Sequence, residues 1–493
     1  MEVHVGGLYG EKEECVNRAF AIESSPKPSN GGGKGCFMFL EVIRSEGLAH
    51  LSYFLGHGEE AFVIDPRRDC RVYEEIARSN GVRITRILET HRNEDYVVGS
   101  TELARRTGAE ILHGGHLDFA YGTAVSDGDR FRTGALELRI LETPGHTDES
   151  ISIAFADKGF GDAPVGVFTG DALFIGDVGR TDFYPDRAEE VAGMLYDSIF
   201  EKILPLGDHV VLYPAHGAGS VCGQGMADRE ISTLGYERRF NPALQVTGRA
   251  EFVERKVREH HDQPPYFRQM ERLNLSGTVP PVRDPVRVPP MSAEGFQAKA
   301  DKGAVVLDVR SPEAMGGALI PGSLGIPLDM VPAFAGWFLP YDREILLVVQ
   351  EEDEVDRAVR FLLRLGYDRV PGYLDEGLHA WEITGREYQT IPSVSARELV
   401  RRIDAKEEFL LLDVRKESEF RAGHLPGAHH LHVGELPDHL DRVPGDRPVV
   451  TFCGSGKRAV IAATLLKQHG FRPVENCLGS MAACSAAGCP IEG

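Results

Sequence analysis

Four short fragments that carry metal-ligand side chains follow one another in the first half of this chain. They are residues 90–96 (THRNEDY), 145–147 (GHT), 169–171 (TGD) and 214–216 (PAH). Each lies a few residues after an apolar, strand-like run, so the ligands are expected to gather where strands end. Imidazole and carboxylate side chains in this order predict a bound divalent metal ion.

The strand-like runs alternate with turn signals and helical patterns, which predicts a domain over residues 36–275. The runs are residues 61–64, 87–88, 138–141, 165–168 and 210–212. Residues 280–290 then contain five prolines. Because proline punctuates regular structure, we predict a linker over residues 276–291.

An internal repeat marks the second half of the chain. Two motifs return at an offset of 105 positions: residues 306–310 (VLDVR) and 320–322 (IPG) recur as 411–415 (LLDVR) and 425–427 (LPG). In both copies a strand-like run precedes a helical pattern, at 345–349 and 356–365 and again at 449–452 and 459–469. The repeat therefore predicts two α/β domains with largely parallel sheets, over residues 292–390 and 393–493.

Composition narrows the partners and the setting. A net charge of −21 argues against nucleic acid or an anionic membrane surface, and no apolar run approaches the roughly 18 residues that span a bilayer. Eight cysteines in 493 residues are too sparse for a disulfide framework, which favours a reducing, cytoplasmic setting. Residues 1–35 show no targeting pattern and are expected to form a disordered tail.

At the ligand fragments the sequence resembles the metallo-β-lactamase superfamily, which implies an αββα sandwich. Residues 179–182 (GRTD) and 213–216 (YPAH) resemble its persulfide dioxygenase branch in particular. The usual superfamily pattern is T-H-x-H-x-D-H, and this chain has Asn93 and Tyr96 at the second and last histidine positions. An amide and a neutral phenol are poor zinc ligands, so these substitutions weigh against a two-zinc site.

What remains is His91, His146 and Asp171, two imidazoles and one carboxylate. This set suits non-haem Fe(II) and oxygen chemistry. The persulfide dioxygenases use the matching positions for a single iron, so the resemblance implies one Fe(II) per chain, with zinc as the alternative. Asp95 and His216 are then expected to orient a bound water or a ligand imidazole by hydrogen bonds, or to hold a second metal.

Two more side chains near the fragments have alternative interpretations. The planar donor fork of Arg180 suits the carboxylate of a thiol substrate, but it suits equally a salt bridge with a neighbour such as Asp182. Cys222 lies six positions after His216 and either approaches the metal pocket or is an ordinary loop thiol.

The last domain resembles rhodanese. The resemblance is carried by residues 413–415 (DVR), 419–420 (EF), 423–427 (GHLPG) and 453–458 (CGSGKR). The last of these lies between a strand and a helix, so backbone N–H groups converge on sulfur and the glycines permit the tight curvature. The helix N-terminus and the nearby cations favour a thiolate, which predicts Cys453 as nucleophile and persulfide carrier. Arg458 is the predicted catalytic partner, and the predicted substrate-binding residues are Gly454, Ser455, Gly456 and Lys457.

The first repeat lacks this chemistry, because no cysteine occurs between Cys222 and Cys453. Its equivalent loop, residues 350–354 (QEEDE), carries carboxylates that repel an anionic sulfur substrate. This domain therefore resembles an inactive rhodanese.

The resemblances together imply an enzyme of sulfide metabolism. A low-molecular-weight persulfide such as glutathione persulfide would react with O2 to give sulfite and the free thiol, and Cys453 would transfer sulfur to form or use thiosulfate. Two alternatives stay open: a thioester hydrolase of the glyoxalase II kind with two metals, and a sulfur carrier in which only Cys453 reacts. The thiol carrier, the direction of transfer and a homo-oligomeric state are also left open.

Overall fold

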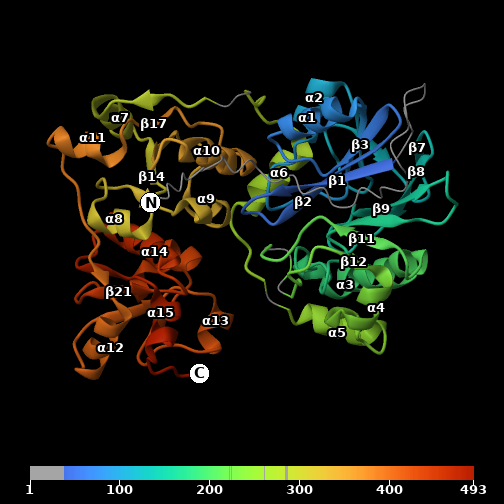
Figure 1. Ribbon diagram of the computed structural model, residues 1–493. Helices are drawn as coiled ribbons and strands as arrows, with labels where there is room; N and C mark the ends of the chain where they lie inside the picture. Colours follow the sequence, from blue (N-terminus) through green and yellow to red (C-terminus); the bar gives the residue numbers. More distant parts are fainter. Residues whose placement is uncertain (1–37, 221–222, 224, 260, 284–286) are drawn as a thin grey trace, which may run out of the picture. The chain divides into compact units, whose positions relative to one another are not determined.

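The computed structural model describes residues 38–220, 223, 225–259, 261–283 and 287–493 (Figure 1). The predicted tail at residues 1–35 and Cys222 lie outside the described residues. The chain forms two compact units: one holds most of the chain up to His261 with Leu275–Gly277, and the other holds Asn93–Val97, Asp262–Asn274 and Thr278–Gly493. In the described part of the chain, no helix is long and apolar enough to cross a membrane.

The first unit is built on two six-stranded sheets. The first sheet has the order β1-β2-β3-β4-β5-β6, with β1 (Met38–Ser45), β2 (His50–His57), β3 (Glu60–Ile64), β4 (Arg83–Glu89), β5 (Glu110–Gly114) and β6 (Thr123–Val125). The second has the order β12-β11-β10-β9-β8-β7, with β7 (Arg130–Thr133), β8 (Leu136–Glu142), β9 (Ile151–Asp157), β10 (Gly166–Gly170), β11 (Val211–Pro214) and β12 (Ser232–Thr233). All five strand-like runs of this domain overlap its strands, and two of them begin one residue earlier than β10 and β11, which confirms the predicted strands.

Alternation of apolar side chains along the strands gives this unit its layers. On β2, Tyr53 and Leu55 belong to the core between the two sheets, whereas Phe54 belongs to the core under the helices. Successive side chains of a strand point to opposite faces, so one strand serves both cores. The result is an αββα sandwich, which confirms the predicted fold.

Helices cover the outer face of each sheet. The first sheet carries α1 (Arg71–Asn80) and α2 (Ser100–Thr107), whose residues Tyr73, Ile76 and Leu103 pack on it. On the second sheet lie α3 (Ala188–Asp197), η2 (Ser198–Ile203), η3 (Leu204–Leu206), α4 (Leu234–Phe240), η4 (Pro242–Leu244) and α5 (Arg249–Val257), and η1 (Pro185–Arg187) directly precedes α3.

The second unit contains two five-stranded sheets, and within each sheet the paired strands are parallel. The first has the order β13-β17-β16-β14-β15, with β13 (Pro290–Met291), β14 (Val305–Asp308), β15 (Leu324–Gly325), β16 (Ile345–Val348) and β17 (Gly372–Leu374). The second has the order β18-β22-β21-β19-β20, with β18 (Ser393–Val394), β19 (Leu410–Asp413), β20 (His429–His430), β21 (Val449–Phe452) and β22 (Val474–Cys477). The predicted parallel α/β domains are confirmed.

The two predicted helical patterns, at 356–365 and 459–469, correspond to α10 and α14 among the helices of the repeats. The first repeat has α7 (Ala293–Ala300), α8 (Pro312–Gly317), η5 (Leu328–Met330), α9 (Val331–Phe338), α10 (Glu354–Arg364) and α11 (Gly377–Ile383). The second has α12 (Ala396–Asp404), α13 (Glu417–Arg421), η6 (Val433–Arg442), α14 (Lys457–Gln468) and α15 (Ser480–Ala487). Most of α6 (Phe267–Ser276) also groups with this unit.

The repeated DVR motif makes the same contacts in both copies. Arg310 donates to Asp308 through Nε and Nη2, and Arg415 does the same to Asp413. Each guanidinium also donates to a backbone carbonyl eight residues further along the chain, at 2.7 and 2.8 Å. A buried charge pair with its hydrogen bonds satisfied locks the loop after the strand, which explains why the motif recurs.

Candidate metal centre and sulfur-transfer loop

The four ligand fragments come together at the ends of four strands of the first unit. His91 follows β4, His146 follows β8, Asp171 directly follows β10, and His216 follows β11. All four side chains are buried. Both sheets therefore contribute to one site.

The geometry of three of these side chains fits a metal ion. Ligand atoms of His91, His146 and Asp171 all lie within 4.8 Å of one another. Asp171 Oδ2 is 3.7 Å from His91 Nε2 and 3.6 Å from His146 Nε2, too long for hydrogen bonds. Two atoms that each bind one ion at about 2.0–2.2 Å are separated by roughly 3.0–3.6 Å. The observed spacing is close to that of a shared ion.

The tautomer of His91 follows from its neighbours. Thr90 donates its hydroxyl proton to Asp65 Oδ2 at 2.7 Å, and Thr90 Oγ1 lies 2.9 Å from His91 Nδ1. Because a hydroxyl has one proton, His91 Nδ1–H must be the donor in the second bond. This leaves the lone pair of Nε2 for the metal. Burial raises the pKa of Asp65 to about 7, although the bonds from Thr90 oppose that shift.

His146 is held in the same tautomer by a different partner. Its Nδ1 lies 3.0 Å from the backbone carbonyl oxygen of Arg180, and a carbonyl only accepts. His146 Nδ1 is therefore protonated and its Nε2 turns toward Asp171. Hydrogen bonds of this kind commonly orient histidine ligands and increase their basicity.

His216 contacts the carboxylate of Asp171. Its Nδ1 lies 2.8 Å from Oδ1 and 3.1 Å from Oδ2. Burial raises the pKa of Asp171, but the surrounding His216, His91 and His146 imidazoles outweigh it and hold the pKa well below its usual range. The contact is of the orienting kind that the sequence predicts for His216, and that role stays a proposal.

The segment Asn93–Val97 groups with the second unit. There the buried side-chain amide of Asn274 donates to the carbonyls of Asn93 and Tyr96, at 2.6 and 2.8 Å. The sequence places Asn93 and Tyr96 where the superfamily has histidines, and the structure places them in a segment fixed by its backbone. A ligand-orienting role for Asp95 stays a prediction.

Arg180 forms a salt bridge with Asp182, which is one of the two roles that the sequence allows for it. The guanidinium, which is fully buried, donates to Asp182 through Nε at 2.6 Å and Nη2 at 2.7 Å, and it lies 4.8 Å from the ring centroid of Phe183. The pair fixes the loop whose carbonyl accepts from His146. A direct contact of Arg180 with substrate stays a prediction.

Glu149 is a site residue that motif reasoning missed. It is buried, and its Oε1 accepts from the backbone N–H of Arg92 at 2.6 Å and from the Thr147 hydroxyl at 2.9 Å. It thereby joins the residue after His91 to the residue after His146. In the sequence, the only sign of this role is that Glu149 lies three positions after His146. Its partner Arg92 is 57 residues away, so no local motif joins the two.

Replacing Glu149 with alanine is expected to lower the free energy of unfolding by about 2–4 kcal/mol, because two buried donors lose their acceptor. The two ligand loops should also separate, so metal content should fall. Denaturant unfolding and metal analysis of the purified protein measure both effects. Glu189→Ala, at an exposed position on α3, serves as control. Full metal content with unchanged stability in Glu149→Ala would contradict this role.

The Cys453 loop directly follows β21. The backbone N–H of Gly456 donates to Cys453 Sγ at 3.1 Å, as expected for N–H groups that converge on sulfur. Cys453 N–H donates to Ser480 Oγ at 3.1 Å, and its carbonyl accepts from Met481 N–H at 3.0 Å. The loop is thus supported by the first turn of α15. Gly456 has φ of +94°, which a residue with a side chain rarely adopts.

The other predicted residues surround this loop. Arg458 donates two hydrogen bonds to Glu419, at 2.6 and 2.7 Å, and Lys457 pairs with Asp329. The Gly454 carbonyl accepts from the start of α15, and Ser455 is exposed. The structure therefore brings the six residues of the motif to one strand-to-helix junction.

The first repeat has Val349 where the second has Cys453, since Asp308 pairs with Val348 and Asp413 pairs with Phe452. In the loop that follows, Glu354 Oε2 accepts from the N–H groups of Gln350 and Glu351, at 3.0 and 3.2 Å. The Glu354 carboxylate therefore accepts hydrogen bonds from two N–H groups of this loop, which are then not available to an anionic substrate. This supports the interpretation of the first repeat as inactive.

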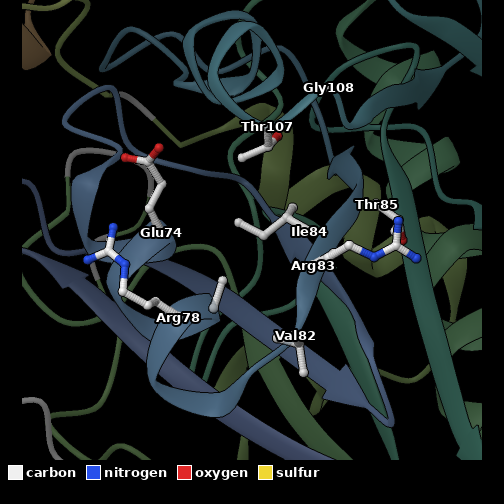
Figure 2. A pocket seen from close by; sticks show the side chains of 9 residues that line it. Glu74, Arg78, Val82, Arg83, Ile84, Thr85, Thr107 and Gly108 are labelled. Carbon is white, nitrogen blue, oxygen red and sulfur yellow. The ribbon is translucent and has the colours of Figure 1, made fainter.

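A pocket of about 460 Å³ lies elsewhere on the first unit (Figure 2). Glu74 and Arg78 of α1 line one side, and Arg83 and Thr85 of β4 line the other. Glu74 is engaged by Arg106, and none of the ligand fragments lines this pocket. It is separate from the candidate metal centre.

Comparison with known proteins agrees with this architecture. Residues 46–216 match the Metallo-beta-lactamase superfamily, and residues 292–384 and 395–487 each match the Rhodanese-like domain. Fold and site together define a metallo-β-lactamase domain followed by two rhodanese-like domains.

Individual relatives narrow this class. Human mitochondrial persulfide dioxygenase ETHE1 is 31% identical over 238 residues, which cover 44% of this chain and 81% of the human protein. The bovine protein of the same name is 30% identical over 227 residues, covering 44% and 79%. The crystal structure of a metallo-beta-lactamase from Staphylococcus aureus subsp. aureus COL is 32% identical, covers 68% of this chain and 98% of that one, and superimposes with a TM-score of 0.61. The chain belongs to the persulfide dioxygenase family.

Proposed function

We propose that this chain is an iron-dependent persulfide dioxygenase joined to a sulfurtransferase. The observation that carries the first half is the convergence of His91, His146 and Asp171 within 4.8 Å in a member of the persulfide dioxygenase family. The proposed substrate is a low-molecular-weight persulfide, such as glutathione persulfide. The persulfide, O2 and water become the free thiol, sulfite and two protons.

A single Fe(II) is the metal proposed for this centre, because two imidazoles and one carboxylate leave coordination positions open for substrates. When bound, it supplies the redox chemistry that joins a sulfur atom to dioxygen. The protein fixes its ligands beforehand. Thr90 and the Arg180 carbonyl hold the two histidine tautomers, and His216 holds the Asp171 carboxylate.

The second half of the proposal is sulfur transfer at Cys453. A persulfide on Cys453 passes its outer sulfur to sulfite: the sulfite lone pair attacks that sulfur, the S–S bond breaks, and thiosulfate leaves. Cys453 keeps the electron pair as a thiolate, stabilised by the Gly456 N–H and the N-terminus of α14. The same groups serve the reverse reaction, from thiosulfate to the enzyme persulfide.

Oxygen consumption tests the oxygenase half directly. Protein loaded with Fe(II) is expected to consume one O2 and form one sulfite for each glutathione persulfide that it oxidises, with sulfite and thiosulfate counted together as product, whereas the zinc-loaded protein should consume none. Zinc has no accessible redox change, so it is a matched control in the same ligand set. Iron-loaded protein that consumes no O2 would contradict the proposal. Hydrolysis of S-lactoylglutathione by protein with two metals per chain would favour the thioester hydrolase instead.

A further inference from the structure

The first rhodanese-like repeat lies along α14, the helix that begins at the Cys453 loop. Three polar contacts run from its last turn to its first: Gln468 Nε2 to the Gly322 carbonyl at 3.0 Å, Gly325 N–H to Thr464 Oγ1 at 3.1 Å, and Lys457 Nζ to the Asp329 carboxylate. Residues 322–329 therefore run antiparallel to α14. Asp329 makes the last of these three contacts, at the first turn of α14.

Close packing fixes the register of this contact. A Cβ at Gly325 would lie 2.6 Å from Met315 Sδ and 2.9 Å from Thr464 Cγ2, so a larger residue there would require these side chains to move. A second anchor lies directly before η6, where the ring centroids of His432 and Trp337 are 5.7 Å apart. With both anchors set, the Asp329 carboxylate is held at the first turn of α14.

Segments outside the second repeat supply acids to its cations. Arg458 pairs with Glu419 of its own domain, but Lys457 pairs with Asp329, and Lys416 Nζ lies 3.5 Å from Asp262 Oδ2. Lys416 follows β19, the neighbour of β21, so it belongs to the same sheet edge as Cys453. Each of these cations is thus partly offset before a substrate arrives.

We propose that Asp329, from the inactive repeat, is a specificity-determining residue of the Cys453 site. Its negative charge offsets Lys457 and weakens the binding of doubly charged sulfur donors, such as thiosulfate, relative to neutral reagents. The proposal rests on the proposed sulfur-transfer function. It gives the first repeat a task that its own loop cannot perform.

Replacing Asp329 with asparagine is expected to lower the KM for thiosulfate by roughly threefold at low salt, with kcat changed less than twofold. The thiosulfate:cyanide assay with the full chain measures both constants. Asp329→Glu keeps the charge and should keep the wild-type KM. At 0.5 M salt the KM difference between Asp329→Asn and the wild type should disappear, because the Debye length at that concentration lies between about 3 and 8 Å. Asp446→Asn is the control, because Asp446 pairs with Arg447 before β21, at the strand end opposite Cys453.

Alkylation of Cys453 measures the local charge without any turnover. The rate with anionic iodoacetate, divided by the rate with neutral iodoacetamide, should rise roughly threefold in Asp329→Asn, as followed by mass spectrometry of the Cys453 peptide. An unchanged ratio, or a KM that is unchanged or raised, overturns the assignment. A raised ratio in a protein without sulfur transfer would uphold the charge assignment and refute the proposed function.

Discussion

Replacing Asp171 with asparagine is expected to empty the metal centre and to reduce oxygen uptake on glutathione persulfide by more than about a hundredfold. Changes to groups that only orient a ligand cost roughly 10–100-fold, so a larger loss distinguishes a ligand from a support. The asparagine amide keeps the shape of the carboxylate but loses its negative charge. Its N–H₂ group faces the imidazoles of His91 and His146, whose Nδ1–H groups already donate to other partners. The loss therefore reflects ligand chemistry and not a cavity.

Iron content per chain and oxygen uptake are measured on the same preparation. Asp157→Asn is the matched control: Asp157 is also buried, and its Oδ1 accepts from Gly159 N–H at 2.9 Å at the far end of β9. That variant should keep its iron and its activity. If Asp171→Asn bound iron and turned over within tenfold of the wild type, the carboxylate would not be a ligand.

The parts of this fold that depend on local pattern could be predicted from the sequence. Strand runs such as residues 165–168 alternate with turn signals over a few residues, and β10 covers Gly166–Gly170. Parallel sheets followed from the repeat at an offset of 105 positions, because two α/β copies must each bury a sheet under helices. The three candidate ligands could be selected from the sequence because each lies in a short motif after a strand, and the structure brings them within 4.8 Å of one another.

The buried acids behind the candidate ligands could not be predicted in the same way. Asp65 reaches Thr90 across 25 positions, and Glu149 reaches Arg92 across 57. No local periodicity records such pairs, because the first forms only when β3 and β4 pair within one sheet and the second only when the two sheets pack. Even the neighbouring pair of Arg180 and Asp182 stayed ambiguous, since a donor fork suits an internal carboxylate and a substrate equally well.

The first repeat shows what local sequence does not reveal. Its sequence revealed the missing cysteine and the acidic loop at residues 350–354, but not which residue replaces Cys453. Strand pairing identifies Val349 at that position. The hydrogen bonds give one of the acids a role: Glu354 accepts from the N–H groups of Gln350 and Glu351, whereas in the second repeat the N–H of Gly456 donates to the Cys453 sulfur.

Replacing Cys453 with serine is expected to reduce thiosulfate:cyanide sulfur transfer by at least about a thousandfold, since an alcohol is scarcely ionised at neutral pH and forms no persulfide. Other thiols of the domain are poor substitutes. Burial raises the pKa of Cys477 to about 12 and raises the pKa of Cys484 further, so both stay protonated. Thiocyanate release measures the loss, and the mass of one added sulfur atom on the Cys453 peptide measures the intermediate.

Oxygen uptake by the same variant separates the two chemistries. The metal centre and the Cys453 loop belong to different units of the chain, so Cys453→Ser should consume O2 at the wild-type rate while sulfite accumulates instead of thiosulfate. Cys489→Ser, at a half-buried thiol of the same domain, should retain both activities. Sulfur transfer that survives in Cys453→Ser would move the nucleophile to another residue. Loss of oxygen uptake as well would mean that persulfide reaches the metal through Cys453, because neither the ligands nor the groups that orient them are changed by this substitution.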